Sequence, residues 1–306
     1  MTQASIQNKR LGIIGFGQVG QAMAGVLADG FEVTVFDLDQ ERCAGHPLMR
    51  EGRLHRAGSA AELAGAVDMV LFCLPTPSAS HAVAEDIAGA VRPGLVVVET
   101  STVAAEDIFQ LDAVLSPRGA RVIDAAVIGG IHSLSQGEAV FLVGASAHDA
   151  QCIAPVLERL AAEIFHLGRL GGGMRAKLVA NAVSHAVYVV LAEAAAVAAA
   201  QDIPMDVLYR LLARKSGLMR PLTHRVGERL FGRDFEGGMS TANARKDSRL
   251  FLDTAHRLDV PVFATQAAHS VYEIAMREGL AAEDYAIVAT LWEHWTGVRF
   301  AIGEQA

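Results

Sequence analysis

Three glycines near the start of the chain stand between two apolar runs. Gly15, Gly17 and Gly20 follow residues 11–14 at G-x-G-x-x-G spacing, and after a helical pattern a second run, residues 31–36, ends at Asp37. Glycines allow a sharp turn, a close approach of backbone to pyrophosphate and tight packing of a helix on a sheet. The N–H groups and the positive dipole end of that helix favour phosphate. This order of strand, turn, helix, strand and acid predicts a dinucleotide-binding site.

The glycine turn and the acid after the second strand supply the expected cofactor contacts. The turn contributes Gly15, Phe16, Gly17, Gln18, Val19 and Gly20. The carboxylate of Asp37 can accept hydrogen bonds from both adenosine-ribose hydroxyls and would repel a 2′-phosphate. Leu38, Asp39 and Gln40 come next, so no basic residue immediately follows Asp37. We therefore expect NAD as the cofactor, with NADP less favoured.

The length and net charge of the chain limit the classes of protein to which it can belong. The chain has 306 residues, of which 52% are hydrophobic, and a formal net charge of −8, which favours about two domains with ample cores. The negative charge argues against nucleic acid and anionic membranes as partners. Cys43, Cys73 and Cys152 show no C-x-x-C pair or zinc-ligand spacing, and the first ten residues lack the apolar core of a signal peptide. We expect no metal and a cytoplasmic location.

The pattern of apolar residues changes near residue 168. Before it, short apolar runs alternate with helical patterns, which predicts an α/β fold with a mostly parallel sheet. The expected strands are 11–14, 31–36, 69–74, 95–99, 121–125, 140–143 and 164–167. After it, the expected helices are 172–201, 204–214, 242–258, 261–278 and 282–300. We predict an α/β domain that binds the dinucleotide, residues 1–168, and an all-helical domain, residues 169–306.

One face of the first long helix, residues 172–201, carries three polar residues, Lys177, Asn181 and His185. Their i, i+4, i+8 spacing places them on one face of an otherwise apolar segment, which we expect to be buried in protein rather than to span a membrane. A buried lysine has a lowered pKa and is a candidate acid–base group. The alternatives are a lysine extended to solvent, an asparagine bonded to backbone, and a histidine hydrogen-bonded in the core.

Several loops follow predicted strands, where an open parallel sheet forms its binding crevice. They are Leu74–Pro77, with Leu74 and Pro75 as cofactor contacts; Thr100–Thr102; and Ile128–Gly130. Hydroxyls and glycine N–H groups in such loops can bind a cofactor or a carboxylate, although ordinary turns use the same residues. Lys246 and Asp247, in a helical region, are by themselves a solvated charge pair.

The order of these motifs resembles that of the β-hydroxyacid dehydrogenases, the group that contains 3-hydroxyisobutyrate dehydrogenase and is related to 6-phosphogluconate dehydrogenase. The family's opening glycine motif is resembled by GFGQVGQAM, and its D-x-S-T loop by ETSTV. The family's substrate segment is resembled by DAAVIGG, which is followed by QGEA. GRLGGGMRAKLVAN resembles the G-x-x-G-x-G-x-x-x-K-x-x-x-N catalytic segment, and RKDSRL the late K-D-L element. The similarity runs over essentially the whole chain. It implies a Rossmann-type NAD-binding domain, residues 1–168, an all-helical substrate and dimerisation domain, residues 169–306, that begins with a long linking helix, and homodimers or homotetramers.

The resemblance also implies residue roles. Lys177 matches the catalytic lysine and Asn181 its partner, while Ser101 and Thr102 match residues near the nicotinamide and substrate. Gly129 and Gly130 match the family glycines whose N–H groups bind the substrate carboxylate. Lys246 matches the family lysine that reaches the cofactor. His185 and Ile128 complete the expected substrate contacts. The resemblance thus implies an NAD-dependent enzyme that interconverts a small hydroxy compound, typically a 3-hydroxy acid, and its carbonyl form.

Departures from the family pattern concern the substrate. Ile128 stands where the family usually has Ser, and Glu99 and Ala126 stand in place of Asp and Pro. Ile128 removes a hydroxyl and adds apolar bulk, which favours a bulkier or more apolar substrate. Two alternatives stay open: an imine reductase of related plan, against which Lys177 argues, and a nucleotide-binding sensor without turnover, against which Lys177 and Asn181 argue.

Overall fold

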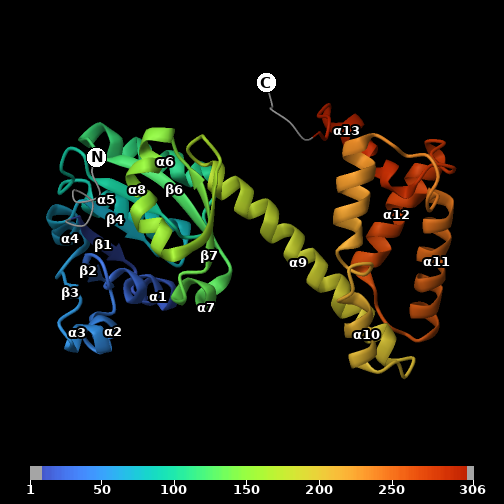
Figure 1. Ribbon diagram of the computed structural model, residues 1–306, viewed down its shortest axis with the longest axis horizontal. Coiled ribbons are helices and arrows are strands. Elements are labelled where there is room, and N and C mark those ends of the chain that lie inside the picture. The colour runs from blue at the N-terminus through green and yellow to red at the C-terminus, as the bar shows by residue number, and fades with distance from the viewer. Residues whose placement is uncertain (1–8, 302–306) are drawn as a thin grey trace. The chain divides into compact units, whose positions relative to one another are not determined.

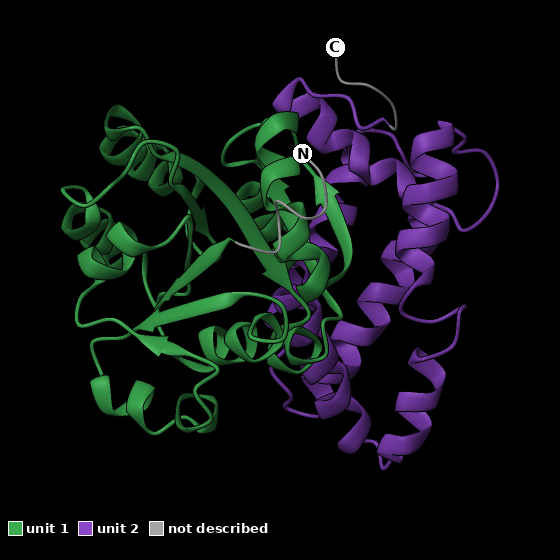
Figure 2. Cartoon of the chain, turned by 60° about the vertical axis from the view of Figure 1, so that its left-hand side comes forward, with its two compact units in different colours: residues 1–182 green, residues 183–306 purple. Residues whose placement is uncertain are grey.

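The chain divides into two compact units on either side of the middle of one long helix. The computed structural model describes residues 9–301, and its contacts place the division between Ala182 and Val183 (Figure 2). Helix α9 (Gly172–Ala199) belongs to both units (Figure 1). The predicted domain boundary, between residues 168 and 169, lies just before this helix.

Unit 1 is built on an eight-stranded sheet in the order β3-β2-β1-β4-β5-β6-β7-β8, and each neighbouring pair is parallel except β6 and β7. The strands are β1 (Arg10–Ile14), β2 (Glu32–Phe36), β3 (His55–Arg56), β4 (Met69–Phe72), β5 (Val96–Glu99), β6 (Arg121–Ile128), β7 (Ala139–Gly144) and β8 (Ala161–His166). The predicted α/β fold with a mostly parallel sheet is confirmed. The sequence did not predict β3, an edge strand of two residues, and β6 runs three residues beyond its predicted end.

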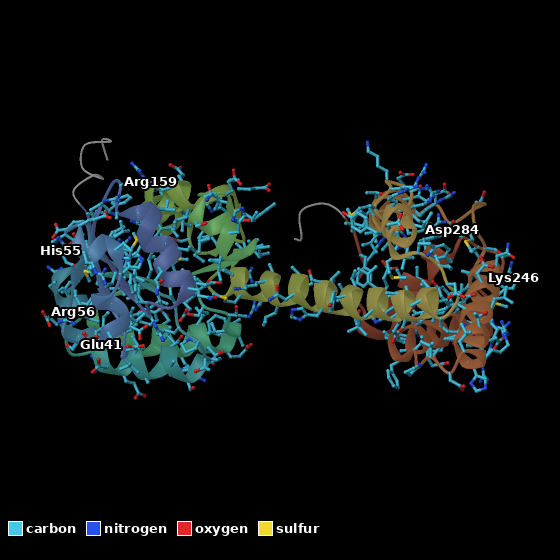
Figure 3. All side chains as sticks on the ribbon, turned by 90° about the horizontal axis from the view of Figure 1, so that it is seen from below. Glu41, His55, Arg56, Arg159, Lys246 and Asp284 are labelled. Atoms are coloured by element: carbon cyan, nitrogen blue, oxygen red, sulfur yellow. The ribbon has the colours of Figure 1, made fainter. Side chains whose placement is uncertain are left out.

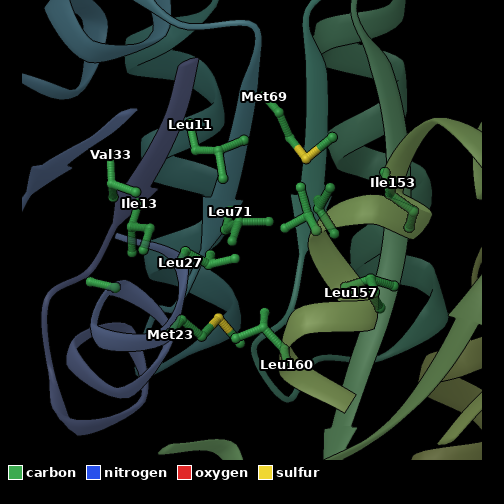
Figure 4. Close-up of a cluster of buried hydrophobic side chains, with 14 of the residues drawn as sticks. Leu11, Ile13, Met23, Leu27, Val33, Met69, Leu71, Ile153, Leu157 and Leu160 are labelled. Atoms are coloured by element: carbon green, nitrogen blue, oxygen red, sulfur yellow. The ribbon is translucent and has the colours of Figure 1, made fainter. Parts of the chain in front are cut away.

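Helices cover both faces of the sheet because its strands are apolar on both sides. On one face lie α1 (Gln18–Leu27), α7 (Gly130–Ser135) and α8 (Ala147–Leu160); on the other lie α4 (Ala60–Ala66), α5 (Pro77–Ile87) and α6 (Ala105–Leu115). Short α2 (Gln40–Ala44) and α3 (Pro47–Arg50) follow β2, and η2 (Ser116–Arg118) follows α6. Side chains alternate along a strand, so Met69 and Leu71 join the first core (Figure 4) while Val70 and Phe72 join the second.

Unit 2 is helical, as predicted. After α9 come α10 (Met205–Leu212), the π-helical η3 (Pro221–Leu230), α11 (Thr241–Arg257), α12 (Phe263–Arg277), the 3-10 turn η4 (Tyr285–Val288) and α13 (Ala289–Thr296). The single helix predicted over residues 282–300 is wrong, because a 3-10 turn precedes the shorter α13, and η3 was not predicted. The carboxylate of Glu193 on α9 accepts the N–H groups of Phe263, Ala264 and Thr265 at 2.6–3.0 Å and so caps α12.

Much of the apolar surface of α9 is exposed in the described part of the single chain. Val179 is 67% exposed and Tyr188 73%, and only 17% of its most apolar 18-residue window is buried. By length and composition α9 could also cross a membrane, a test that core helices of soluble proteins pass as well. The sequence pattern indicated an apolar helix but not what covers it.

Candidate functional site

The three glycines shape the turn between β1 and α1. Gly15 has a φ of +94°, and a Cβ atom there would lie 2.3 Å from the carbonyl oxygen of Cys73. A Cβ atom on Gly20 would lie 2.1 Å from the Gly15 carbonyl oxygen, whereas one on Gly17 would meet no atom within 4 Å. The first and third glycines therefore permit close packing, and the second leaves open space at the beginning of α1.

A cavity of about 730 Å³ opens beside this turn, within the size range of small-molecule and cofactor sites. The residues predicted to bind the cofactor that line it are Gly15, Gly17, Gln18, Val19, Asp37, Leu74 and Pro75. Gly17 is the N-cap of α1, makes no capping side-chain hydrogen bond, and no acidic residue follows in the first turn. The helix N-terminus is therefore free to receive an anion, and the cavity fits a dinucleotide.

Other residues predicted for this site do not line the cavity. Phe16 has a fully buried side chain whose ring lies edge-on to His46 at 5.2 Å between centroids. Its backbone N–H instead donates to Asp37 Oδ2 at 2.6 Å. Gly20 lies behind the turn, and Thr102 is exposed outside the cavity lining. Phe16 and Gly20 thus shape the turn from inside the fold.

Asp37 has a cationic neighbour that the sequence argument missed. Arg42, on α2, lies 3.3 Å from Asp37 Oδ2 through Nη1, and both residues line the cavity. The side chain of Asp37 is 12% exposed and that of Arg42 43%. The helical turn at Gln40–Ala44 brings a residue five positions along the chain back to the carboxylate. The search for a basic residue immediately after Asp37 was too short to find it.

A buried carboxylate on β6 anchors the beginning of α9. Asp124 has no exposed surface, and its oxygens accept the N–H groups of Gly171 at 2.6 Å and Met174 at 2.9 Å. Burial raises the pKa of Asp124, and these N–H groups act against that rise. A Cβ atom on Gly173 would lie 2.1 Å from the carbonyl oxygen of Leu142. The GGG segment and Asp124 together fix where α9 leaves the sheet, a role that the sequence analysis did not assign.

Lys177 lies on the first turns of α9 and is buried. The residue is 8% exposed, so the alternative of a lysine extended to solvent is wrong. Burial lowers the pKa of the Lys177 amine, and the charge of Glu99 opposes that fall. A buried amine with a lowered pKa is a candidate donor and acceptor of a proton.

Two hydrogen bonds connect the cavity to Glu99 at the end of β5. The N–H of Leu74, a cavity residue, donates to Ser101 Oγ at 2.8 Å, and the N–H of Ser101 donates to Glu99 Oε1 at 2.7 Å. Burial raises the pKa of Glu99, and the N–H and hydroxyl groups near it oppose that rise. The structure therefore joins the predicted residues Leu74 and Ser101 to Glu99, which the sequence analysis noted only as a departure.

The segment after β6 has the backbone form expected of a glycine turn. Ile128 is half-buried at the end of β6, paired with Val140, and Gly129 and Gly130 have φ values of +112° and +74°. The Ile128 side chain packs against the second core of unit 1. The proposed contacts of these three residues with a substrate stay predictions.

The remaining predicted residues lie further along α9 or in unit 2. Asn181 is half-buried, one helical turn after Lys177. His185 lies beyond the division and is exposed, so the alternative of a core histidine is wrong. Lys246, on α11, lies 2.9 Å from Asp247 with 62% of its side chain exposed (Figure 3). Their predicted contacts with substrate and cofactor stay predictions.

Two family models cover most of the chain. Residues 10–168 match the NAD binding domain of 6-phosphogluconate dehydrogenase. Residues 171–292 match a model described as the NAD-binding domain of NADP-dependent 3-hydroxyisobutyrate dehydrogenase. The first match alone covers more than half of the chain and includes the glycine turn, the cavity and Glu99.

Curated relatives align over nearly their full length. The 2-(hydroxymethyl)glutarate dehydrogenase of Eubacterium barkeri is 27% identical over 96% of this chain and 98% of its own. The NAD-dependent L-serine dehydrogenase of Pseudomonas aeruginosa is 28% identical over 94% and 99%. The mitochondrial 3-hydroxyisobutyrate dehydrogenase of Drosophila melanogaster is 28% identical over 92% and 89%. The names of these relatives all describe dehydrogenases.

Solved structures share the fold. An imine reductase from a Pseudomonas species superposes with a TM-score of 0.84 at 19% identity, covering 93% of this chain and 99% of its own. A 3-hydroxyisobutyrate dehydrogenase from Mycobacterium tuberculosis, solved with L-serine, has a TM-score of 0.64 at 25% identity over 93% and 99%. The first likeness shows the fold alone.

Proposed function

The chain belongs to the β-hydroxyacid dehydrogenase family, and from that premise we propose that it interconverts a small hydroxy compound and its carbonyl form. The observation that carries this proposal is the burial of Lys177 on the first turns of α9, in the same unit as the cavity beside the glycine turn. One unit thus holds both a pocket that fits a dinucleotide and an amine that can exchange a proton.

Different residues of unit 1 have different roles in the proposed reaction. Oxidation of a CH–OH group removes one hydride and one proton, and bound nicotinamide supplies the hydride acceptor. The Lys177 amine takes the hydroxyl proton at Nζ in this direction, and its ammonium returns a proton to the carbonyl oxygen in the other. Asn181 orients the hydroxyl group, and the N–H groups of Gly129 and Gly130 hold the far end of the substrate.

NAD is the proposed cofactor, because Asp37 lies at the ribose end of a dinucleotide bound in the order that the glycine turn dictates. Its carboxylate would repel a 2′-phosphate, whereas Arg42 beside it would attract one. Asp37 is the more buried of the two and is held by the N–H of Phe16, while Arg42 is nearly half exposed. The fixed anion is therefore expected to outweigh the movable cation.

A substrate panel tests the proposed activity. The substrates are 2-(hydroxymethyl)glutarate, 3-hydroxyisobutyrate, L-serine and L-threonate, with analogues that carry larger apolar groups, each with NAD⁺ and NADP⁺. We expect reduction of NAD⁺, measured as absorbance of the reduced nicotinamide, and better turnover of the more apolar substrates because of Ile128. A chain that binds NAD⁺ but oxidises none of them would instead be a nucleotide-binding sensor.

Reduction of a C=N bond is the second candidate, since an imine reductase shares the fold. The panel therefore includes cyclic imines with NADH and NADPH. Lys177 argues against this candidate, because a hydroxyl group needs a base to remove its proton and the buried amine supplies one. Imine reduction faster than any hydroxy-acid oxidation would replace the proposed function.

We also propose a homodimer or homotetramer in the cytoplasm. The exposed apolar side chains of α9 form a surface that a second copy of the chain can cover, and the net charge of −8 disfavours an anionic membrane as its cover. Cys43, Cys73 and Cys152 are unpaired thiols, as suits a reducing compartment. Light scattering of the purified chain tests the oligomer, and a monomer at micromolar concentration would contradict it.

A further inference from the structure

The hydroxyl group of Ser101 is used inside the fold. Ser101 follows β5 and is only 7% exposed. Its Oγ accepts the N–H of Leu74 at 2.8 Å and donates to the carbonyl oxygen of Phe72 over 3.4 Å. A hydroxyl group has one proton and can accept two hydrogen bonds. Contacts within unit 1 therefore occupy its proton and one acceptor position, and little of its surface is left for a substrate.

The backbone of Ser101 is held as well. Its N–H donates to Glu99 Oε1 at 2.7 Å, and Glu99 has no exposed surface. The preceding residue, Thr100, binds the Phe72 carbonyl oxygen twice, through its N–H at 3.1 Å and through its hydroxyl at 2.6 Å. The loop after β5 is thus fixed to the end of β4, and the Ser101 hydroxyl has a defined position from which to hold Leu74.

Leu74 lies where the loop after β4 packs against the glycine turn. The N–H of its neighbour Cys73 donates to the Ile14 carbonyl oxygen at 2.9 Å. A Cβ atom on Gly15 would lie 2.3 Å from the carbonyl oxygen of Cys73 and 3.1 Å from a side-chain carbon of Leu74. Leu74, Pro75 and Gly15 line the same cavity. Because the two segments are so close, a small movement of the Leu74 loop changes the shape of the cavity beside the glycine turn.

The prolines of this loop increase the importance of the Ser101 contact. Pro75 and Pro77 have no N–H group to donate. A residue before proline is restricted to extended backbone conformations, which limits how Leu74 can direct its N–H to another acceptor. Removing the Ser101 hydroxyl would therefore leave this part-buried N–H without a partner, at a cost in free energy.

We propose that Ser101 is a positioning residue whose hydroxyl holds the loop Leu74–Pro75 in the shape that the dinucleotide needs, and that it does not bind the substrate. The family resemblance implied a substrate contact for this residue, whereas the hydrogen bonds of its side chain favour a different role. The inference deepens the proposed function and rests on its cofactor, because Ser101 acts on catalysis only through the fit of the nucleotide. Asn181, Gly129 and Gly130 remain the proposed substrate contacts.

Hydrogen exchange tests the contact without substrate or cofactor. Residues 73–77 include two prolines, so they carry only three amide hydrogens, one of which belongs to Leu74. Mass spectrometry of overlapping peptides then resolves the Leu74 amide. In the wild type this amide should exchange slowly, because a hydrogen-bonded amide exchanges only when the structure opens locally. Exchange of the Leu74 amide at the rate of an open loop would by itself overturn the proposal.

Ser101→Ala removes the acceptor of the Leu74 N–H. We expect the exchange rate of the Leu74 amide to rise about tenfold, as for loss of one typical hydrogen bond. The Kd for NAD⁺, measured by calorimetry, should rise about fivefold, because a loop that is no longer held must be ordered when the nucleotide binds. Ser101→Thr keeps a hydroxyl group and should retain most of both properties. Ser270→Ala is the matched control, because it removes an exposed hydroxyl that donates to a backbone carbonyl of α12, and it should change neither.

The two roles of Ser101 predict opposite results for Ser101→Ala. If Ser101 holds the loop, the Kd for NAD⁺ rises, while the KM of the hydroxy substrate at saturating NAD⁺ changes by less than about twofold. If Ser101 binds the substrate, that KM rises while the Kd for NAD⁺ and the exchange rate of Leu74 stay at wild-type values, and the proposal is overturned. Circular dichroism confirms the fold of the variant. For a variant that does not fold, the wild-type exchange rate of Leu74 decides.

The same measurements separate this proposal from the proposed function. If the substrate panel is silent but Ser101→Ala changes both loop exchange and NAD⁺ binding, the proposed activity fails and the positioning role stands. If the panel succeeds and Ser101→Ala changes neither, the positioning role fails and the proposed activity stands.

Discussion

The cavity beside the glycine turn and the buried corner at the beginning of α9 are built in opposite ways. The cavity is open, and most of its predicted lining comes from one continuous segment, Gly15 to Asp37. The corner is closed and joins Asp124 on β6 to Gly171 and Met174 at the beginning of α9, which are distant from it in the sequence. The cavity presents backbone groups to a ligand, whereas the corner holds charges away from water.

This difference predicts which amino-acid substitutions each region tolerates. A side chain added at Gly17 projects into open space, so the cavity can change its contacts without disturbing the fold. In the corner, Asp124 accepts two N–H groups of α9, and removing its carboxylate leaves them without an acceptor. Substitutions in the corner should therefore affect chemistry and stability together, and substitutions at the cavity should mainly affect the choice of ligand.

The largest effect is expected at Lys177. Lys177→Met keeps the length of the side chain and removes the amine, so kcat/KM should fall at least about 100-fold, as for loss of a general acid–base group. The Kd for NAD⁺, measured by calorimetry, should change little. In wild type, the acid limb of the oxidation profile should lie below the ordinary lysine pKa of 10.5, since burial lowers it.

Lys215→Met provides the matched control for that experiment, because it removes an exposed lysine from unit 2. It should retain wild-type kinetics. Equal losses in both variants would mean that Lys177 contributes charge or stability to the fold and not proton transfer.

Gly20 tests the closed side of the glycine turn. Gly20→Ala places a methyl group against the Gly15 carbonyl oxygen and should lower the free energy of unfolding by about 3 kcal/mol, at the upper end for overpacking. Gly25→Ala, in the same helix with open space around it, should stabilise the protein by about 0.5–1 kcal/mol. Urea unfolding followed by circular dichroism is needed, because both tryptophans, Trp292 and Trp295, lie in unit 2.

Asp124 tests the anchor of α9. Asp124→Asn keeps the shape of the side chain but leaves one of two N–H groups without an acceptor, at a cost of about 2 kcal/mol in the free energy of unfolding. Activity should fall as well, because Lys177 loses its fixed position. Glu85→Gln, an exposed change on α5, should alter neither quantity; a similar loss there would show that the assay does not resolve the anchor.

The smallest effect is expected at the cavity rim. Asp37→Ala should lower the ratio of kcat/KM for NAD⁺ over NADP⁺ about tenfold, the equivalent of about 1.4 kcal/mol, because the anion that repels a 2′-phosphate is lost and Arg42 is released. Adding Arg42→Ala should remove the gain in NADP⁺ use. A wild-type enzyme that already prefers NADP⁺ would reverse our assignment of Asp37.

The same difference between the cavity and the corner determines how much of each could be predicted from the sequence. The sheet and the glycine turn were predicted, because local periodicity and spacing determine them. Arg42 was missed because a helical turn brings it back to Asp37, and the role of Asp124 was missed because its partners lie 47 or more residues further along the chain. Lys177 could be singled out from its spacing and family resemblance, but its burial required the fold.

Chemical rescue of a lysine deletion tests the central claim most directly. Lys177→Ala leaves a small space in the corner that methylamine or ethylamine can enter. If the amine at this position transfers the proton, the oxidation rate of the variant should rise with added amine, and more steeply at higher pH, while the wild-type rate stays constant. A variant that binds NAD⁺ and substrate normally but gains no rate from any small amine would contradict the account.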